Sequence, residues 1–508
     1  MDAATRGELT LDAGLAADPL LLAGAALLVG GVICAGFAER LGVPGLLLFL
    51  GLGMVIGDDG FGLINLADAR LAQSIGVVAL VVILYEGGLV TSLATLRPVA
   101  LPALLLATVG VVITAAVVAG AAYLVLDTAL TTALLIGAVV ASTDAAAVFG
   151  VLRKASLPRR LTALLEAESG SNDPMAILLT VGLLAAAAGP VAPIDWVVFG
   201  LRQLLGGAVV GVAVGSLGAF ALNRSRLRSA GLYPVLGLGI AGLAYGAAAA
   251  GATSGFLAVY VAGVVVTARS PRQRRALRTF HEGLAASAQI ALFLLLGLLV
   301  FPSQLPDVAF EAGAIAMVLV LVARPLAVAM CLLPCRMPVR EAAFAGWAGL
   351  RGAVPIVLAT FPLTVGYEDG DLIFNIVFFV VLVSAVVQGF TIAPVASRLG
   401  LGAEPDRLAG VAEIIPLDTV GVDVVEIEVV SASAVAGGTL AASPLPGEAR
   451  VVAIVRGEQV LVPTGSSVLA VGDLLMVVST SRPDLAAVLQ TWLAGDVAAD
   501  APVDQGTA

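Results

Sequence analysis

The sequence Glu168-Ser169-Gly170-Ser171-Asn172-Asp173-Pro174 places two acids inside an apolar run that extends from Leu161 to Ala188. Successive helical residues are rotated by about 100°, so the two acids, Ser169 and Asn172 fall within one wedge of roughly 140°. Pro174 has no N–H, so the carbonyl four residues earlier loses its helical donor and becomes a spare oxygen ligand. One ionised side chain at the centre of a membrane helix costs about 2.5–3.5 kcal/mol on insertion scales. The stretch therefore predicts a hard-cation site whose acids also take up protons.

The composition indicates a membrane protein with many spans. Of the 508 residues, 60% are hydrophobic and only 12% are charged. These values exclude a soluble globular protein. Nucleic acid is not an expected partner, because no basic cluster accompanies exposed aromatic residues. The three cysteines, Cys34, Cys331 and Cys335, are expected to be free thiols rather than disulfide or zinc ligands.

Hydropathy predicts thirteen membrane spans. The first should stay as a helix rather than be cleaved as a signal peptide, because four acids and a single Arg precede it. The spans cover approximately residues 20–38, 43–57, 71–90, 99–124, 129–152, 161–188, 195–222, 231–250, 254–268, 283–301, 309–333, 341–361 and 372–397.

Charges in the connecting loops predict the orientation of these spans. Loops after odd-numbered spans hold seventeen Lys and Arg side chains, whereas the N-terminal segment and the other loops hold three. Acidic turns such as Asp58-Asp59 and Glu368–Asp371 lie on the side that is poor in cations. By the positive-inside rule, the N-terminus is outside and the C-terminus is cytoplasmic, and we expect the cell inner membrane as the location.

A change of composition after Gly400 predicts a second domain. Residues 1–19 form a short extracytoplasmic segment, and residues 20–400 form the transmembrane domain. An acidic linker at 401–422 leads to a small cytoplasmic α/β domain at 423–494, and 495–508 is expected to be disordered. The predicted strands are Val424–Val430, Arg450–Arg456, Gln459–Val462 and Val468–Val478, and the closing helix is Asp484–Leu493.

Two further membrane segments combine polar residues with helix-weakening ones. Asp144 lies at the middle of span five beside two hydroxyl residues. In Gly349–Pro355 of span twelve, the proline removes the donor for the carbonyl of Arg351, which indicates a discontinuous helix with a buried cation. Spans five and twelve are seven apart, so two inverted copies of a six-span unit would place both at a midplane transport site.

Several residues also have purely structural interpretations. Glu168 and Asp173 could pair with Arg351 without binding an ion, and Asp144 could cap a helix terminus. For Arg351 we favour a structural role, in which it neutralises a buried carboxylate and holds the broken helix together. Glu86 lies near the end of span three and could instead reach water.

Other polar residues of the membrane segments are expected to lie outside the site. Gln289, Asn375 and Gln388 are predicted to form hydrogen bonds between helices. His281 is predicted to be a solvated residue at the cytoplasmic border, although a pH-sensing role is chemically open.

The polar stretches resemble the NhaP-type monovalent cation/proton antiporters, most of all the bacterial potassium/proton branch with a cytoplasmic tail domain. The likeness covers residues 20–397, and the tail resembles the TrkA-C (RCK-C) regulatory domain of potassium-transport proteins. The implied fold is an all-α polytopic membrane protein with inverted repeats and two crossing discontinuous helices, plus a small cytoplasmic α/β domain. The segments that carry the resemblance are Ala141–Val148, Glu166–Ala176, Phe280–Leu299, Gly349–Leu358, Val451–Arg456 and Val471–Leu475.

The resemblance implies a ligand set for the transported ion. Asp173 would be the essential carboxylate that binds the cation and the proton. Glu168 and Ser169 would add oxygen ligands, and Thr143 would contribute its backbone carbonyl or its hydroxyl. No cofactor is implied; the ions concerned are protons and K⁺ or Na⁺.

The same resemblance implies supporting residues. Asp144 would lie at the crossing of two unwound helices, and Asn172 and Arg351 would stabilise the site around Glu168, with Glu86 as a further supporting residue. Familiar members have Thr-Asp-Pro where this chain has an alanine after Asp144, which leaves the backbone geometry there open.

Competition between proton and cation explains how such a site exchanges them. A carboxylate removed from water takes up a proton, whereas a bound cation favours the ionised form and expels that proton. The resemblance implies electroneutral one-for-one exchange, because Asn172 stands where electrogenic relatives of this fold have a second aspartate. It also implies a homodimer, with a nucleotide as the regulator of the tail domain.

Two alternatives to K⁺/H⁺ exchange stay open. The tail domain favours K⁺, yet oxygen ligands suit Na⁺ and Li⁺ as well. A gated cation channel or a membrane sensor is the alternative of another class, although a channel would need a carbonyl ring or a continuous polar pore. An enzyme is not expected, because a hydrolase would need a nucleophile with a base, and the single His lies at a helix border.

Overall fold

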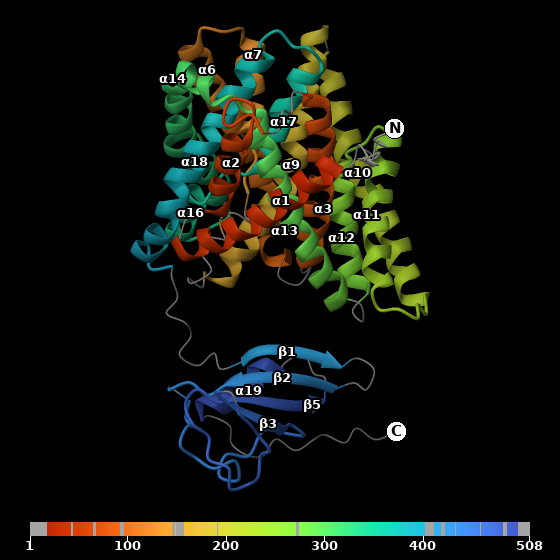
Figure 1. Cartoon of the computed structure of the whole chain (residues 1–508), viewed down its shortest axis with the longest axis vertical. Helices are drawn as coiled ribbons and strands as arrows, with labels where there is room; N and C mark the ends of the chain where they lie inside the picture. Colours follow the sequence, from red (N-terminus) through yellow and green to blue (C-terminus); the bar gives the residue numbers. More distant parts are fainter. Residues whose placement is uncertain are drawn as a thin grey trace, which may run out of the picture. The chain divides into compact units, whose positions relative to one another are not determined.

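The computed structural model describes residues 18–41, 44–63, 68–91, 96–144, 148, 157–189, 192–270, 274–401, 411–417, 422–431, 433–457, 459–480 and 485–495. Contacts divide the chain into a helical unit that ends at Gly402 and a second unit that begins at Ala403 (Figure 1). Each unit has its own hydrophobic core.

The helical unit is built from apolar helices that cover nearly all of its described residues (Figure 1). Its first half contains α1 (Asp18–Leu41), α2 (Gly45–Ile56), α3 (Ala69–Val90), η1 (Arg97–Val99), α5 (Ala100–Leu105), η2 (Leu106–Gly110), α6 (Val111–Leu126), α7 (Leu130–Val139) and α9 (Arg159–Ala188). Its second half contains α10 (Pro193–Arg224), α11 (Leu232–Ala250), α12 (Gly255–Arg269), α13 (Arg274–Leu299), η4 (Pro302–Gln304), α14 (Leu305–Val318), η5 (Leu319–Ala323), α15 (Arg324–Leu332), α16 (Val339–Trp347), α17 (Ala353–Thr364) and α18 (Gly370–Arg398).

These helices confirm the predicted fold class. Among the described residues, eight helices are long and apolar enough to cross a membrane, judged by length and composition. Five shorter apolar helices complete the set, and each predicted span coincides with one of the thirteen segments. The part of span five after Asp144 lies mostly outside the described residues.

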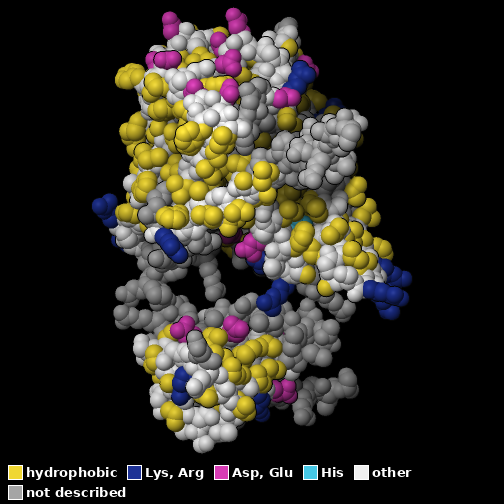
Figure 2. All heavy atoms as spheres, viewed as in Figure 1, with side chains coloured by type: hydrophobic (Ala, Val, Ile, Leu, Met, Phe, Trp, Pro, Cys, Tyr) yellow, Lys and Arg dark blue, Asp and Glu magenta, His cyan; other side chains and the backbone are white. Residues whose placement is uncertain are grey.

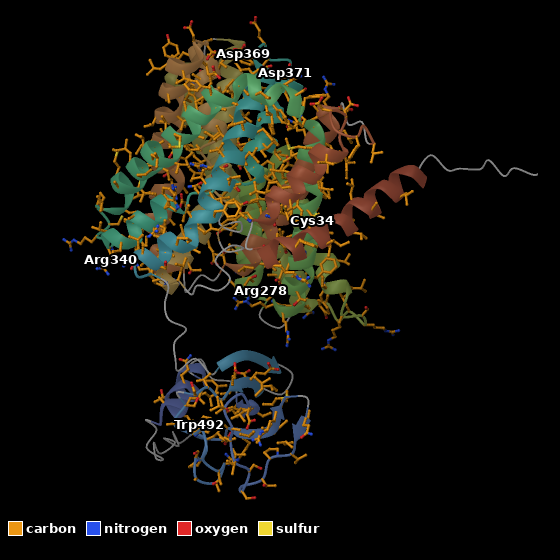
Figure 3. All side chains as sticks on the ribbon, turned by 60° about the vertical axis from the view of Figure 1, so that its left-hand side comes forward. Cys34, Arg278, Arg340, Asp369, Asp371 and Trp492 are labelled. Atoms are coloured by element: carbon orange, nitrogen blue, oxygen red, sulfur yellow. The ribbon has the colours of Figure 1, made fainter. Side chains whose placement is uncertain are left out.

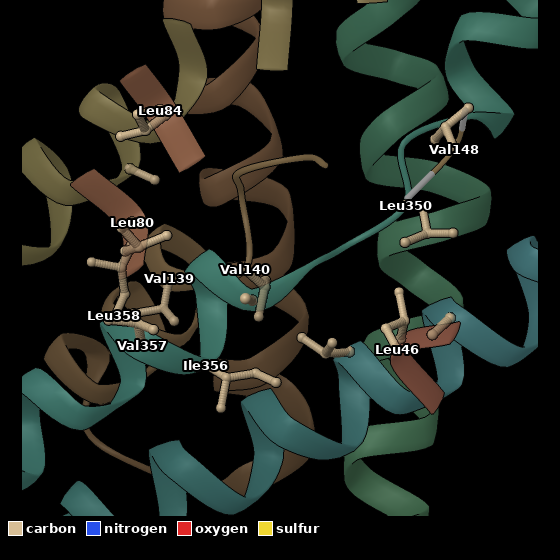
Figure 4. Close-up of a cluster of buried hydrophobic side chains, with 14 of the residues drawn as sticks. Leu46, Leu80, Leu84, Val139, Val140, Val148, Leu350, Ile356, Val357 and Leu358 are labelled. Carbon is tan, nitrogen blue, oxygen red and sulfur yellow. The ribbon is translucent and has the colours of Figure 1, made fainter. Parts of the chain in front are cut away.

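Spans five and twelve are both interrupted, as the glycine and proline pattern predicts. The first helix of span five, α7, ends at Val139 and is followed by a turn and a non-helical segment, Ser142–Asp144. Between α16 and α17 the backbone is likewise not helical. The two interruptions meet where the N–H of Asp144 donates to the carbonyl of Leu350 at 2.8 Å. Buried side chains such as Val140 and Ile356 lie close to this crossing (Figure 4).

Spans four and eleven share a second irregularity. Each contains one π-helical turn, η2 in the first and η5 in the second. These spans are also seven apart, so the two kinds of interruption recur at corresponding places in the two halves. This recurrence agrees with the predicted inverted repeat.

Glycine pairs allow two helix crossings in the helical unit to be very close. A Cβ at Gly88 of α3 would lie 3.1 Å from the Cα of Gly263 of α12. A Cβ at Gly53 of α2 would lie 2.9 Å from the Cα of Gly297 of α13. Small residues permit this approach in membranes, where lipid provides no hydrophobic drive for helix association. The helices α3 and α12 are therefore packed closely against each other.

Acidic and basic side chains are separated along the helical unit. Figure 3 shows Asp369 and Asp371 at one end, and Arg278 and Arg340 at the opposite end. On the face seen in Figure 2, acidic side chains likewise gather at the first end and basic ones at the second. The charge asymmetry behind the predicted orientation is thus present in three dimensions, and the orientation itself stays a prediction.

The second unit contains one antiparallel sheet with strand order β1-β2-β5-β3-β4. Its elements are β1 (Val411–Leu417), β2 (Val422–Glu428), β3 (Arg450–Arg456), β4 (Gln459–Leu461), β5 (Leu474–Thr480) and α19 (Leu485–Ala494). Trp492 of α19 is buried in the core with strand residues such as Val477. The strands differ from the prediction in two places. β1 falls within the predicted linker, and β5 begins six residues later than Val468, because Gly472 adopts a φ of 89° in the preceding turn.

An ion pair fixes that turn. Arg456 donates from Nε to Oδ1 and from Nη2 to Oδ2 of Asp473, each at 2.7 Å, and the N–H of Ala470 donates to Oδ2 at 2.8 Å. The hydrogen bonds from Arg456 hold the pKa of the Asp473 carboxyl below its usual value. The pair therefore ties the start of β5 to the end of β3.

We expect Asp473→Asn to destabilise the second unit by about 1.5–3 kcal/mol, because it removes hydrogen bonds to a charged group. Since the folded pKa is lowered, this stabilisation is complete above the unfolded pKa of about 3.9 and is lost as pH falls through the folded value. Hydrogen exchange of β5 peptides in the full-length protein should therefore differ between variant and wild type at pH 7, and less at strongly acidic pH. Arg450→Gln, which removes an exposed arginine of β3 that has no carboxylate partner in the described part of the chain, is the matched control. Equal protection of β5 in variant and wild type at pH 7 would contradict the expectation.

Candidate ion-binding site

A cavity of about 200 Å³ lies inside the helical unit. Its walls come from α3, the extended segment after α7, α9, α12, α13 and the start of α17. Four carboxyl groups line it, those of Glu86, Asp144, Glu166 and Asp173, and its described lining includes no Lys, Arg or His. Such a low-dielectric pocket with charge of one sign attracts cations.

Asp173 is the most buried of the four acids. It is 6% exposed, and its Oδ1 has no hydrogen-bond partner among the described residues. Gly170, whose carbonyl loses its helical donor to Pro174, also lines the cavity. The buried carboxylate therefore faces the cavity with one oxygen unused by the protein.

Thr143 is anchored to α9 through both of its oxygens. The hydroxyl of Ser169 donates to the Thr143 carbonyl at 3.0 Å, and Nδ2 of Asn172 donates to the Thr143 hydroxyl at 2.6 Å. Thr143 and Ser169 line the cavity together with Asp173. The structure thus brings these three predicted ligands together, and their roles stay predictions. Asn172 supports Thr143 here, and its predicted role in stabilising the surroundings of Glu168 stays a prediction.

Glu168 points away from this group. It is 1% exposed, does not line the cavity, and forms a two-pronged ion pair with Arg324 at the start of α15. One prong joins Nη2 to Oε2 at 2.8 Å, and the other joins Nη1 to Oε1. The predictions that Glu168 coordinates the ion, or pairs with Arg351, do not fit this geometry, because a nearer buried arginine takes both of its oxygens.

Arg351 binds backbone carbonyls. It is fully buried, and its Nη1 donates to the carbonyls of Ala141 at 2.9 Å and Ser142 at 2.6 Å. These carbonyls follow the C-terminal end of α7, which carries the negative end of the helix dipole. The guanidinium thus binds the end of the broken helix in span five, whereas the prediction assigned it to the broken helix of span twelve, and no carboxylate bonds to it among the described residues.

Residues of α18 provide hydrogen-bond partners for backbone groups in the interruption between α16 and α17. The N–H of Arg351 donates to the Ser384 hydroxyl at 3.2 Å, and that hydroxyl donates to Oε1 of Gln388. Nε2 of Gln388 donates to the carbonyl of Trp347 at 2.8 Å. Gln388 therefore forms hydrogen bonds between helices, as predicted, and so does Asn375, which donates to Gln304.

Asp144 lies at the crossing and lines the cavity. Its side chain also lies against Gly352, the residue before α17: a Cβ at Gly352 would lie 2.6 Å from the Cβ and Cγ of Asp144. A carboxylate next to the start of a helix is stabilised by the helix dipole. The position is therefore compatible with both predicted roles, ion ligand and helix-terminus partner.

We expect Gly352→Ala to reduce exchange about tenfold or more, because the added methyl group must displace Asp144 or separate the crossing segments. Cation-dependent proton movement in everted vesicles, normalised to protein amount, measures the effect. Gly242→Ala in α11, where a Cβ would meet nothing within 4 Å, is the matched control. Wild-type exchange by Gly352→Ala would show that the crossing tolerates the shift.

Sequence reasoning missed three residues of this region: Arg324, Glu166 and Tyr260. The sequence does mark Arg324, because it is the only cation inside the apolar span 309–333. It also marks Glu166, because Glu166 precedes Asp173 by seven residues and so lies on the same helical face. It does not mark Tyr260, since nothing in its own span distinguishes it.

The structure also decides three ambiguous residues. Glu86 lines the cavity, and so does Gln289, which was expected to bond between helices. His281 is fully buried, with its ring centroid 5.1 Å from that of Tyr85, so the prediction of a solvated border residue is wrong. The reason is that α13 begins at Arg274, more than two turns before the predicted span, and buries His281 against α3.

Comparisons with known proteins give two family matches. The family described as "Sodium/hydrogen exchanger, transmembrane" matches residues 24–398, and the TrkA-C domain matches residues 424–489. Residues 24–398 contain every described residue that lines the cavity.

Individual relatives agree with these matches. The chain is 42% identical over 407 residues to the K(+)/H(+) antiporter NhaP of Alkalimonas amylolytica, covering 79% of this chain and 70% of that protein. It is 38% identical over 474 residues to the K(+)/H(+) antiporter NhaP2 of Shewanella sp. (strain ANA-3), covering 92% and 82%. The sodium proton antiporter MjNhaP1 from Methanocaldococcus jannaschii has the same fold, with a TM-score of 0.66 at 23% identity, covering 75% of this chain and 99% of that one.

Proposed function

The chain belongs to the sodium/hydrogen exchanger family, and on that premise we propose that it exchanges K⁺ for protons at a site centred on Asp173. Cation/proton antiport follows from the family and from relatives named as antiporters. K⁺ is favoured because relatives at 37–42% identity over most of the chain carry K(+)/H(+) in their names. A relative named Na(+)/H(+) antiporter NhaP, from Pseudomonas aeruginosa, is 31% identical over 357 residues, and supports Na⁺ as the alternative.

The observation that carries the proposal is buried Asp173, which lines a cavity with three other carboxyl groups and has one oxygen without a hydrogen-bond partner among the described residues. Without a cation, a proton neutralises this carboxylate; when a cation binds, the ionised form is favoured and the proton leaves. Thr143, Ser169 and Asp144 are proposed to supply the remaining oxygen ligands. Glu168 acts indirectly, by neutralising Arg324 behind the site.

We propose one-for-one exchange because Asn172, next to Asp173, cannot take up or release a proton. Its Nδ2 is held by the Thr143 hydroxyl, so the position next to Asp173 offers an amide that does not titrate. The single titrating acid then binds either one proton or one monovalent cation, so each cycle exchanges one for the other without net charge movement. No cofactor takes part in this scheme, and the transported ions are K⁺, or Na⁺, and H⁺.

We place the N-terminus outside and the second unit in the cytoplasm, on the distribution of Arg and Lys. Glu166 lies about 10 Å along α9 from Asp173, toward the end that begins with Arg159, so the cavity opens toward the cytoplasm in this orientation. The cell inner membrane, a homodimer and a nucleotide regulator of the TrkA-C domain complete the proposal.

Proton movement in everted vesicles tests the proposal. We expect addition of K⁺ to collapse an imposed proton gradient at lower concentrations than Na⁺ or Li⁺, and the response to be unchanged when a permeant anion such as thiocyanate collapses the membrane potential. A larger response to Na⁺ or Li⁺ would favour the alternative substrate. Cation flux without coupled proton movement would favour a channel.

A further inference from the structure

Tyr260 of α12 lines the cavity together with residues of α9. It is 6% exposed, and its ring lies against Gly170, where a Cβ would be 2.7 Å from the ring Cζ. Gly170 precedes Asp173 by about 4.5 Å along the helix axis. The absence of a side chain at Gly170 therefore brings the phenol within one helical turn of the titrating carboxylate.

The hydrogen of the Tyr260 hydroxyl is directed at Thr91, which lines the cavity as well. The Thr91 hydroxyl donates to the carbonyl of Gly87 at 2.8 Å, and a carbonyl can only accept. The Thr91 and Tyr260 oxygens are 3.2 Å apart, so Tyr260 must be the donor in that contact. The phenol hydrogen is thus committed, and the lone pairs of the oxygen are left for another partner.

Tyr260 is held firmly in this orientation. The glycine pair of Gly88 and Gly263 packs α12 closely against α3, and the Thr267 hydroxyl donates to the carbonyl of Leu89 at 2.8 Å. Thr91 belongs to the same wall, since it directly follows α3. The phenol oxygen and the Thr91 hydroxyl that orients it therefore both come from the closely packed α3–α12 pair, whereas Asp173 comes from α9.

We propose that the phenol oxygen of Tyr260 is a neutral ligand for the transported cation while the cavity is open to the cytoplasm. The chemistry suits a monovalent cation, which replaces part of its hydration shell with oxygen lone pairs. Alternating access requires the walls of the cavity to separate, so the cation leaves Tyr260 on the way to the other face. This inference rests on the proposed function and deepens it, because it assigns one ligand to one side of the membrane.

Tyr260→Phe tests the inference, because it removes only the oxygen. In everted vesicles, where the added cation meets the cytoplasmic face, we expect the half-saturating K⁺ concentration to rise about fivefold, with the maximal rate within about twofold of wild type. In right-side-out vesicles the half-saturating concentration should not change. Tyr245→Phe, which removes a phenol oxygen of α11 outside the cavity, is the matched control.

The hydrogen bond from Tyr260 to Thr91 provides a second test. Thr91→Val removes the acceptor of the phenol hydrogen and should raise the same half-saturating concentration, whereas Thr91→Ser should restore it. In the Tyr260→Phe background, Thr91→Val should add nothing, because both changes act through one oxygen. An unchanged cytoplasmic value in Tyr260→Phe, or an equal change on both faces, would overturn the inference. Asp173→Asn measured alongside separates the two proposals, since exchange by that variant would overturn the proposed function itself.

Discussion

Asp173→Asn is expected to abolish cation/proton exchange while the protein folds and inserts normally. An amide of nearly the same shape cannot take up or release a proton, and it cannot offer a negative charge to a cation. The side chain has an unpartnered Oδ1 in the wild type, so the substitution breaks no hydrogen bond at that atom. Proton movement on addition of K⁺, Na⁺ and Li⁺ to everted vesicles measures the loss.

Asp371→Asn is the matched control, because Asp371 lies in the first turn of α18 and does not line the cavity. This variant should exchange like wild type. Size-exclusion profiles of both variants should show folded protein. Exchange above about a tenth of the wild-type rate in Asp173→Asn would move the titrating role to another acid of the cavity, with Glu166 and Asp144 as the candidates.

The second large effect is expected at the ion pair between Glu168 and Arg324. Both side chains are almost completely buried, so removing one partner leaves an uncompensated charge in the membrane interior. Breaking a buried pair typically costs about 3–5 kcal/mol, whereas replacing both partners with uncharged residues is often nearly neutral. We therefore expect Arg324→Met and Glu168→Gln each to lower the melting temperature strongly, and the double variant to regain most of the loss.

The double variant also decides the role of Glu168. If Glu168 only balances Arg324, the double variant should retain measurable exchange, since neither side chain lines the cavity. If Glu168 coordinates the ion, the double variant should be stable and inactive. Arg340→Met is the control for a loss of arginine, because Arg340 is exposed at the start of α16. Additive losses of stability in the double variant would show that the two side chains are not coupled.

Local features of the site could be predicted from the sequence, because their causes are local. The interruption of span twelve follows from glycines and a proline within a few residues of Arg351. The acids of α9 were recognised as a membrane-depth cluster, but the wedge ran from Glu168 to Asp173 and did not include Glu166. The face that lines the cavity instead runs through Glu166 and Asp173, and a strict seven-residue spacing would have found it.

Pairings between distant segments could not be predicted in this way. Arg324 is 156 residues from Glu168, and no local pattern distinguishes it from Arg351 as the partner of a buried acid. The contact of Tyr260 with Gly170 could not be predicted either, because it depends on how α12, itself packed against α3, lies beside α9. In the second unit, β1 was missed because Val411–Leu417 shows no polar-apolar alternation and contains a proline, yet it pairs with β2 in the sheet.

The π-helical turn η5 ends directly before Arg324. Such a turn contains one residue more than the α-helix requires, so it rotates everything after it by about 100° relative to a regular helix. The extra residue therefore sets the direction in which Arg324 points. A one-residue deletion anywhere in η5 would turn the arginine off Glu168, although every amino acid of the pair would still be present. In the evolution of this chain, changes of length in span eleven are accordingly more hazardous to the pair than substitutions around it.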